Sequence, residues 1–192
     1  AVAMQKPDSL RTAPEPTVAL TEKRITPTFG NQYSKPFLAR VGRETYLGGY
    51  VDFQFKDEEE RDKFFDQGRL VPFIYGDVSE LIKFATEIEI EHGGPNSPDG
   101  GEIKVEFATL DVTFSEAVNF RAGIILSPLG KLNLVHDSPL QDLTDRPLVD
   151  RLIIPTTLSE EGVGFFGSVY PGEEDRLDYE FYVVDGMDGL RK

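Results

Sequence analysis

After residue 43, apolar and polar side chains alternate with a period of two through most of the chain. Successive side chains of a β-strand point to opposite faces, so this pattern predicts strands with one apolar and one polar face. Residues 81–91 are the clearest case, because Ile82, Phe84, Ile88 and Ile90 alternate with lysine and glutamate. An amphipathic helix would repeat every three to four residues instead. The alternation therefore restricts this part of the chain to sheet.

The alternation and the turn formers between its runs predict about seven strands. Pro72 falls inside one of them and predicts an edge, a bulge or a strand end there, because proline cannot donate to a ladder. In another, Ile103, Val105 and Phe107 form the apolar face, and a change of phase after Thr109 predicts a bulge. The predicted strands are 46–56, 69–76, 81–91, 102–114, 118–126, 163–170 and 177–184.

Short turns connect several of these strands, and short turns can join only antiparallel neighbours. The predicted fold class is therefore all-β, as an antiparallel meander. Residues 1–43 contain Pro7, Pro14, Pro16 and Pro27 and are predicted to form an extended leader. Residues 44–192 hold the sheet, with a long loop at 127–162 that lacks sustained alternation.

The predicted connections alternate in length along the chain. Those at 77–80, 115–117 and 171–175 are short, whereas those at 57–68, 92–101 and 127–162 are long. Because successive strands reverse direction, all the short turns fall at one end of the sheet. This asymmetry and strands of about 10 residues are typical of transmembrane β-barrels. The alternation alone favours a soluble β-sandwich, and strand length together with loop sorting makes the barrel an equal alternative.

Composition excludes several classes of function. The chain carries 34 Asp and Glu against 20 Lys and Arg, a net charge of −14 that repels nucleic acid. It has no cysteine and two histidines, so thiolate chemistry and cysteine-based metal sites are excluded. No catalytic, phosphate-binding or metal-ligand motif is present. We therefore expect no enzymatic activity, no cofactor and no metal.

Five blocks of sequence, together in this order, resemble a family of Gram-negative outer-membrane porin-like proteins related to the phosphate-selective porin O/P group. The resemblance runs from residue 48 to residue 186. Its blocks are residues 73–79 (FIYGDVS), 85–93 (ATEIEIEHG), 121–130 (RAGIILSPLG), 136–157 and 182–186 (YVVDG). The resemblance implies a barrel of about 16 strands in the outer membrane that passes small solutes. Its partners would be outer-membrane lipid and small solutes, and a trimeric homo-oligomer is the expected assembly.

A barrel of that size needs roughly twice this many residues, and an open sheet edge in lipid leaves backbone groups unpaired. We therefore expect the chain to be the N-terminal half of a longer barrel, and a barrel shared among several chains is the less favoured alternative.

If the apolar faces contact lipid, the opposite faces line a pore. Its glutamate excess would favour cations over anions, so phosphate selectivity is not expected. The predicted pore-lining residues, which would project into water, are Lys83, Glu87, Glu89, Glu91, Glu102, Lys104, Glu106 and Arg121.

The loop 127–162 is predicted to fold into the lumen as a constriction, in which Asp–Arg pairs pin the loop or filter the solute. Its candidate residues are His136, Asp137, Asp142, Asp145, Arg146, Asp150 and Arg151. The competing hypothesis is a soluble or surface-associated β-sandwich that serves as a binding or structural module.

Overall fold

The structure is a computed structural model that describes residues 39–41, 44–57, 63–94, 100–144, 146–153, 157–172 and 175–186. The predicted leader lies outside these residues except for residues 39–41, and Ala39 and Arg40 pair with β2. The sheet therefore begins a few residues earlier than predicted.

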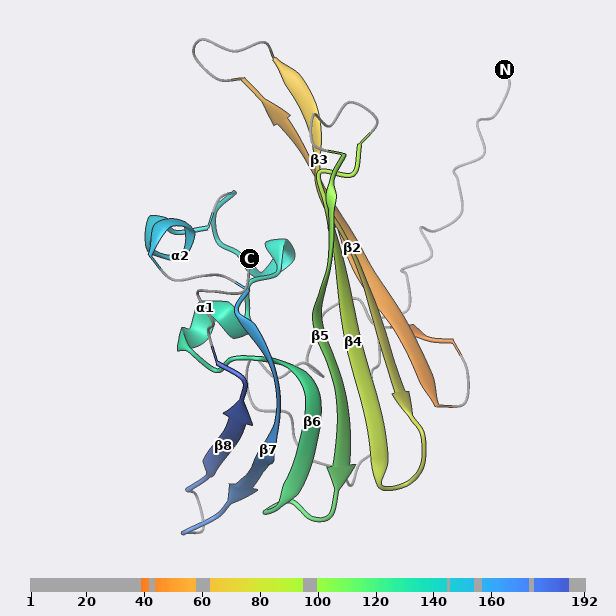
Figure 1. Cartoon of the computed structure of the whole chain (residues 1–192), viewed down its shortest axis with the longest axis vertical. Helices are drawn as coiled ribbons and strands as arrows, with labels where there is room; N and C mark the ends of the chain where they lie inside the picture. Colours follow the sequence, from red (N-terminus) through yellow and green to blue (C-terminus); the bar gives the residue numbers. More distant parts are fainter. Residues whose placement is uncertain are drawn as a thin grey trace, which may run out of the picture.

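All described strands form one sheet, in which each strand pairs antiparallel with the next one in the chain (Figure 1). The predicted all-β antiparallel meander is confirmed, with eight strands where about seven were expected. The strands are β1 (Ala39–Arg40), β2 (Thr45–Lys56), β3 (Phe64–Asp77), β4 (Ile82–Glu91), β5 (Glu102–Thr113), β6 (Asn119–Leu126), β7 (Ser159–Val169) and β8 (Leu177–Val184).

Two strand boundaries differ from the prediction by more than one residue. β3 begins at Phe64 and β7 at Ser159, so the connections before them are 57–63 and 127–158 rather than 57–68 and 127–162. The alternation is poor in both stretches, because Phe64 and Phe65 are adjacent and Glu160 is followed by Glu161. Cross-strand pairing with β2 and β6 forms the ladder despite the weak local pattern.

The predicted bulge is present but lies nearer the start of β5. Glu87 pairs with Phe107 whereas Ile88 pairs with Val105, so Glu106 is the extra residue. The bulge reverses the phase, and Phe107 faces the same side as Glu106 instead of sharing a face with Val105. The prediction for Phe107 was wrong for this reason.

Pro72 lies in β3, an interior strand between β2 and β4, and not at a sheet edge. The pairing of β3 with β4 is interrupted there, between the pairs Leu70–Ile90 and Phe73–Glu87. The sheet tolerates the proline because the ladder skips the position at which an amide donor is missing. On the other side, Pro72 pairs with Gly49, which has a φ of 143° and whose Cβ would lie 2.3 Å from the Val71 carbonyl oxygen.

The connection from β6 to β7 contains three short helical turns where no helix was expected. They are α1 (Gly130–Leu134), the 3₁₀ turn η2 (Ser138–Leu140) and α2 (Leu148–Leu152). We call residues 127–158 the inner segment. Its side chains contact β5 and also β2, which is three strands away in the sheet, and both contacts are on the same face. Among the described residues, no helix is long and apolar enough to cross a membrane.

The two faces of the sheet differ in what covers them. The face that carries the inner segment, here called the inner face, holds the buried core, in which Leu134 packs beside aromatic residues of β3 and β5. The opposite, outer face carries large apolar side chains that remain exposed, among them Val51, Ile103, Val163 and Phe181. The fold therefore covers its more polar face and leaves an apolar face open.

Candidate functional site

The predicted pore-lining residues share the inner face of β4, β5 and β6. Alternation places Lys83, Glu87, Glu89 and Glu91 there, and the register pairs Glu91 with Glu102 and Glu89 with Lys104. The prediction that they project into water is wrong for half of them. Glu87, Glu89, Glu106 and Arg121 are each 4% exposed or less.

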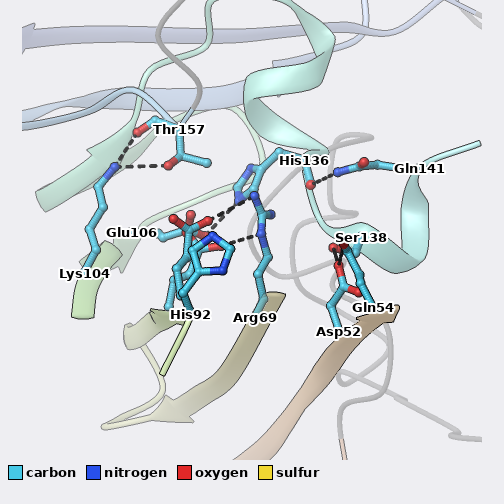
Figure 2. Close-up of polar contacts among 12 residues, drawn as sticks. Asp52, Gln54, Arg69, His92, Lys104, Glu106, His136, Ser138, Gln141 and Thr157 are labelled. Carbon is cyan, nitrogen blue, oxygen red and sulfur yellow. Dashed lines mark hydrogen bonds and ion pairs between the residues drawn. The ribbon is translucent and has the colours of Figure 1, made fainter. Parts of the chain in front are cut away.

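The inner segment is a direct cause of this burial. Figure 2 shows His136 of the segment facing Glu106 of β5, with Arg69 of β3 nearby. The Nε2 atom of His136 lies 2.8 Å from Oε2 of Glu106. Both side chains are removed from water, and burying a charge without a partner costs roughly several kcal/mol. The pairing of His136 with Glu106 offsets this cost.

A hydrogen bond within the segment determines which ring nitrogen of His136 acts as a donor. Its Nδ1 atom lies 3.0 Å from the Asn133 carbonyl oxygen, which can only accept, so Nδ1 carries a proton. Gln141 donates to the backbone carbonyl of His136 at 2.6 Å and holds the same loop. The imidazole is therefore fixed in orientation, with Nε2 aimed at the strands.

Two guanidinium groups lie beside the buried carboxylates. Arg69 forms ion pairs with Glu89 at 3.0 Å and with Glu91 at 3.2 Å. Arg146 of the inner segment is half-buried, and burial together with the positive charge of Arg69 lowers the pKa of its guanidinium. Arg146, Glu89 and Glu91 border a polar cavity of about 200 Å³, which Glu102, Lys104 and Thr157 complete.

Further polar contacts attach the inner segment to the sheet near its middle and at its C-terminal end. Ser138 donates to Asp52 of β2 at 2.9 Å, and Lys104 of β5 donates to the Thr157 carbonyl oxygen at 2.9 Å (Figure 2). Asn133 bridges the start and end of the segment through the carbonyl oxygens of Ser127 and Leu158.

A second buried polar cluster lies on the inner face of β5 and β6. Arg121 forms a two-pronged ion pair with Asp111, with both N–O distances at 2.8 Å. The guanidinium also donates to the Tyr182 hydroxyl and lies over the Phe166 ring at 4.4 Å. Because Arg121 of β6 binds Asp111 of β5 and Tyr182 of β8, we interpret this cluster as a structural link between the strands.

The other predicted constriction residues are dispersed. Asp137 is buried beside His136, Asp150 is partly buried in α2, and Asp142 is exposed. Asp145 and the side chain of Arg151 lie outside the described residues. The segment is attached through His136, Ser138 and Thr157 to strand residues.

Sequence reasoning missed several of the residues that build this site, among them Asp52, Arg69, Asn133, Ser138 and Thr157. Arg69 begins a predicted strand, and its position opposite Glu91 follows from the register. The others are ordinary polar residues in loops or strands, with no local pattern that marks them.

No protein-family model matches the chain, and no solved structure matches it. The chain is similar to an uncharacterized protein of Aquifex aeolicus (strain VF5), with 38% identity over 154 residues. The match covers 77% of this chain and 34% of that protein, so the chain spans about a third of the length of the curated relative.

Proposed function

We propose that the chain forms part of an outer-membrane, porin-like β-barrel channel through which small solutes diffuse passively. In this proposal the outer face of the sheet contacts lipid, the inner face lines the lumen, and the inner segment narrows it. The single observation that carries the proposal is that a continuous apolar face is left open while the polar face is covered.

The outer face is apolar across strands β2 to β8. In the described strands, outward positions carry a charged side chain only at Glu161, near the start of β7. A soluble monomer rarely exposes so large an apolar surface, whereas the outer surface of a membrane barrel consists of such a band. The exposed apolar side chains of this face include Leu47, Val51, Phe53, Phe55, Phe65, Leu70, Ile103, Val105, Leu110, Val163, Phe165, Val169, Leu177, Phe181 and Val183.

The ends of the strands support the same orientation. The turns 78–81 and 114–118, the last residue of β7 (Val169) and the first residue of β8 (Leu177) lie at the lower end of the sheet in Figure 1, and the inner segment joins strands at the opposite end. Tyr179 lies next to the 114–118 turn, where its hydroxyl donates to the Ala117 carbonyl oxygen. Tyrosine is frequent at the rims of membrane barrels because its ring is apolar and its hydroxyl polar.

Closure of the barrel is part of the proposal. In the described sheet, β1 and β8 are the edge strands, and each pairs with only one neighbouring strand. Hydrocarbon does not tolerate unpaired backbone groups, so additional strands must close the sheet, as in a barrel of about 16 strands. A trimer of such barrels is the proposed assembly.

The lumen would favour cations. On the inner face of β4 to β6, the predicted pore-lining set contains five glutamates against two lysines and one arginine, and three of the glutamates and the arginine are buried. The inner segment adds the exposed carboxylate of Asp142. The resulting negative potential would concentrate cations in the lumen.

Conductance across a planar lipid bilayer tests this function. The full-length natural protein, extracted in detergent, should produce discrete conductance steps and a reversal potential of the cation-selective sign in a salt gradient. Replacement of residues 130–152 by a short Gly/Ser linker should raise the size of each step severalfold. No conductance, together with a protein that is soluble without detergent, would instead support the β-sandwich module, whose apolar face packs on a second sheet.

A further inference from the structure

We propose that Glu87, Glu106 and His136 form a binding site for a divalent transition-metal cation of the Zn²⁺ type. The proposal is independent of channel activity, because it rests on the ligand geometry alone. One ligand atom from each of the three side chains lies within 4.8 Å of the others.

Three separate elements bring these ligands together. Glu87 lies on β4, Glu106 on β5 at the bulge, and His136 in the inner segment. The bulge matters because it turns Glu106 and Phe107 both toward the inner face. All three ligand side chains are buried, at 1% exposure or less.

The hydrogen bond of His136 prepares Nε2 for coordination. Since Nδ1 donates to the Asn133 carbonyl oxygen, a neutral imidazole presents the Nε2 lone pair to the Glu106 carboxylate, 2.8 Å away. Metal-binding histidines commonly donate their other ring nitrogen to a backbone carbonyl in this manner. Two atoms that both accept hydrogen bonds can lie this close only with a proton or a cation between them.

A second observation points to a cation. Oε1 of Glu106 is buried and has no hydrogen-bond partner among the described residues. Leaving a buried carboxylate oxygen without a donor is unfavourable, and a metal ion would satisfy it. The ligand atoms of a tetrahedral zinc are roughly 3.3 Å apart, so the Glu106–His136 pair needs to open by about half an ångström.

The chemistry of the donors selects the class of metal. One imidazole nitrogen with carboxylate oxygens suits zinc and its transition-metal neighbours, whereas calcium and magnesium prefer oxygen alone. The polar cavity bordered by Glu89 and Lys104 lies next to the site along both strands, since these residues are two positions from Glu87 and Glu106. A bound ion would join β4, β5 and the inner segment.

Zinc binding to the full chain, stripped of metal with a chelator, tests the proposal. Equilibrium dialysis followed by elemental analysis should find one tightly bound Zn²⁺ per chain. His136→Gln and Glu106→Gln should each weaken binding at least tenfold. The matched control is His92→Gln, because His92 is the other histidine of the chain and lies exposed beside Asp66. This variant should bind as the wild type does.

Two further readouts keep the test decisive if the buried-site variants do not fold. Zn²⁺ should raise the melting temperature of the wild type and of His92→Gln, because binding to the folded state stabilises it. Cu²⁺ bound to His92→Gln should show nitrogen hyperfine coupling in its electron paramagnetic resonance spectrum, since His136 is then the remaining imidazole. Absence of stoichiometric zinc in the wild type, loss of zinc in His92→Gln, or a copper spectrum without nitrogen coupling would overturn the proposal.

Discussion

The Nε2 atom of His136 lies 2.8 Å from Oε2 of Glu106 and thereby joins the inner segment to β5. Both side chains are almost completely buried. We expect His136→Ala to lower the free energy of unfolding by about 3–5 kcal/mol, because it leaves the Glu106 carboxylate buried without its partner. The chain contains no tryptophan, so unfolding in denaturant is followed by far-ultraviolet circular dichroism, which measures the change in free energy.

The matched control for this variant is His92→Ala. His92 also faces a carboxylate, that of Asp66 at 2.9 Å, but more than half of its side chain is exposed. Its loss should cost less than about 1 kcal/mol. Equal effects of the two substitutions would show that the buried pair does not anchor the segment.

The ion pair between Arg121 and Asp111 should behave as a unit. Arg121→Met or Asp111→Leu alone should each cost about 3–5 kcal/mol, since each leaves one buried charge without its partner. The double variant should cost less than either single variant, because both charges are then gone. A double-mutant cycle measures this coupling, and additive single effects would contradict it.

Gly123 permits the close approach of β6 to β5. Its φ is 129°, and a Cβ at this position would lie 2.1 Å from the Ala108 carbonyl oxygen. Gly123→Ala should therefore lower the free energy of unfolding by more than about 1 kcal/mol. Gly94→Ala is the control, because nothing lies within 4 Å of its added Cβ, and it should be nearly neutral.

A charge on the outer face distinguishes lipid from water as its neighbour. Leu110 lies on the outer face of β5, between Phe84 and Ala122 of the adjacent strands. If the face contacts lipid, Leu110→Arg should cost about 2–4 kcal/mol near the bilayer midplane. If the face contacts water, the cost should stay within about 0.5 kcal/mol.

The control for this substitution is Val78→Arg, since Val78 is an exposed residue of the turn between β3 and β4. It should have little effect in either case. Unfolding of both variants in lipid vesicles, compared with the wild type, provides the measurement, and a neutral Leu110→Arg would count against the membrane proposal.

The site was less predictable than the strands. Glu87 and Glu106 were recognised as members of one polar face, and His136 as part of a loop that folds onto it. No local pattern predicts that the three side chains converge, and no metal site was expected. The three residues are separated by 19 and 30 positions, and no motif links them. The bulge that places Phe107 on the same face as Glu106 was expected near Thr109, because Ala108 and Thr109 fit either face of a strand.

Local sequence by itself determined which side chains share a face of each strand that carries no bulge. Ile82, Phe84, Ile88 and Ile90 had to lie opposite Glu87 and Glu89, because the side-chain period of a strand is two residues wherever the strand is regular. The same rule placed Leu177, Tyr179, Phe181 and Val183 on one side of β8. Only the tertiary structure decided which of the two faces is buried. Burial depends on where a distant segment packs, and the inner segment covers the polar face while the apolar face stays open.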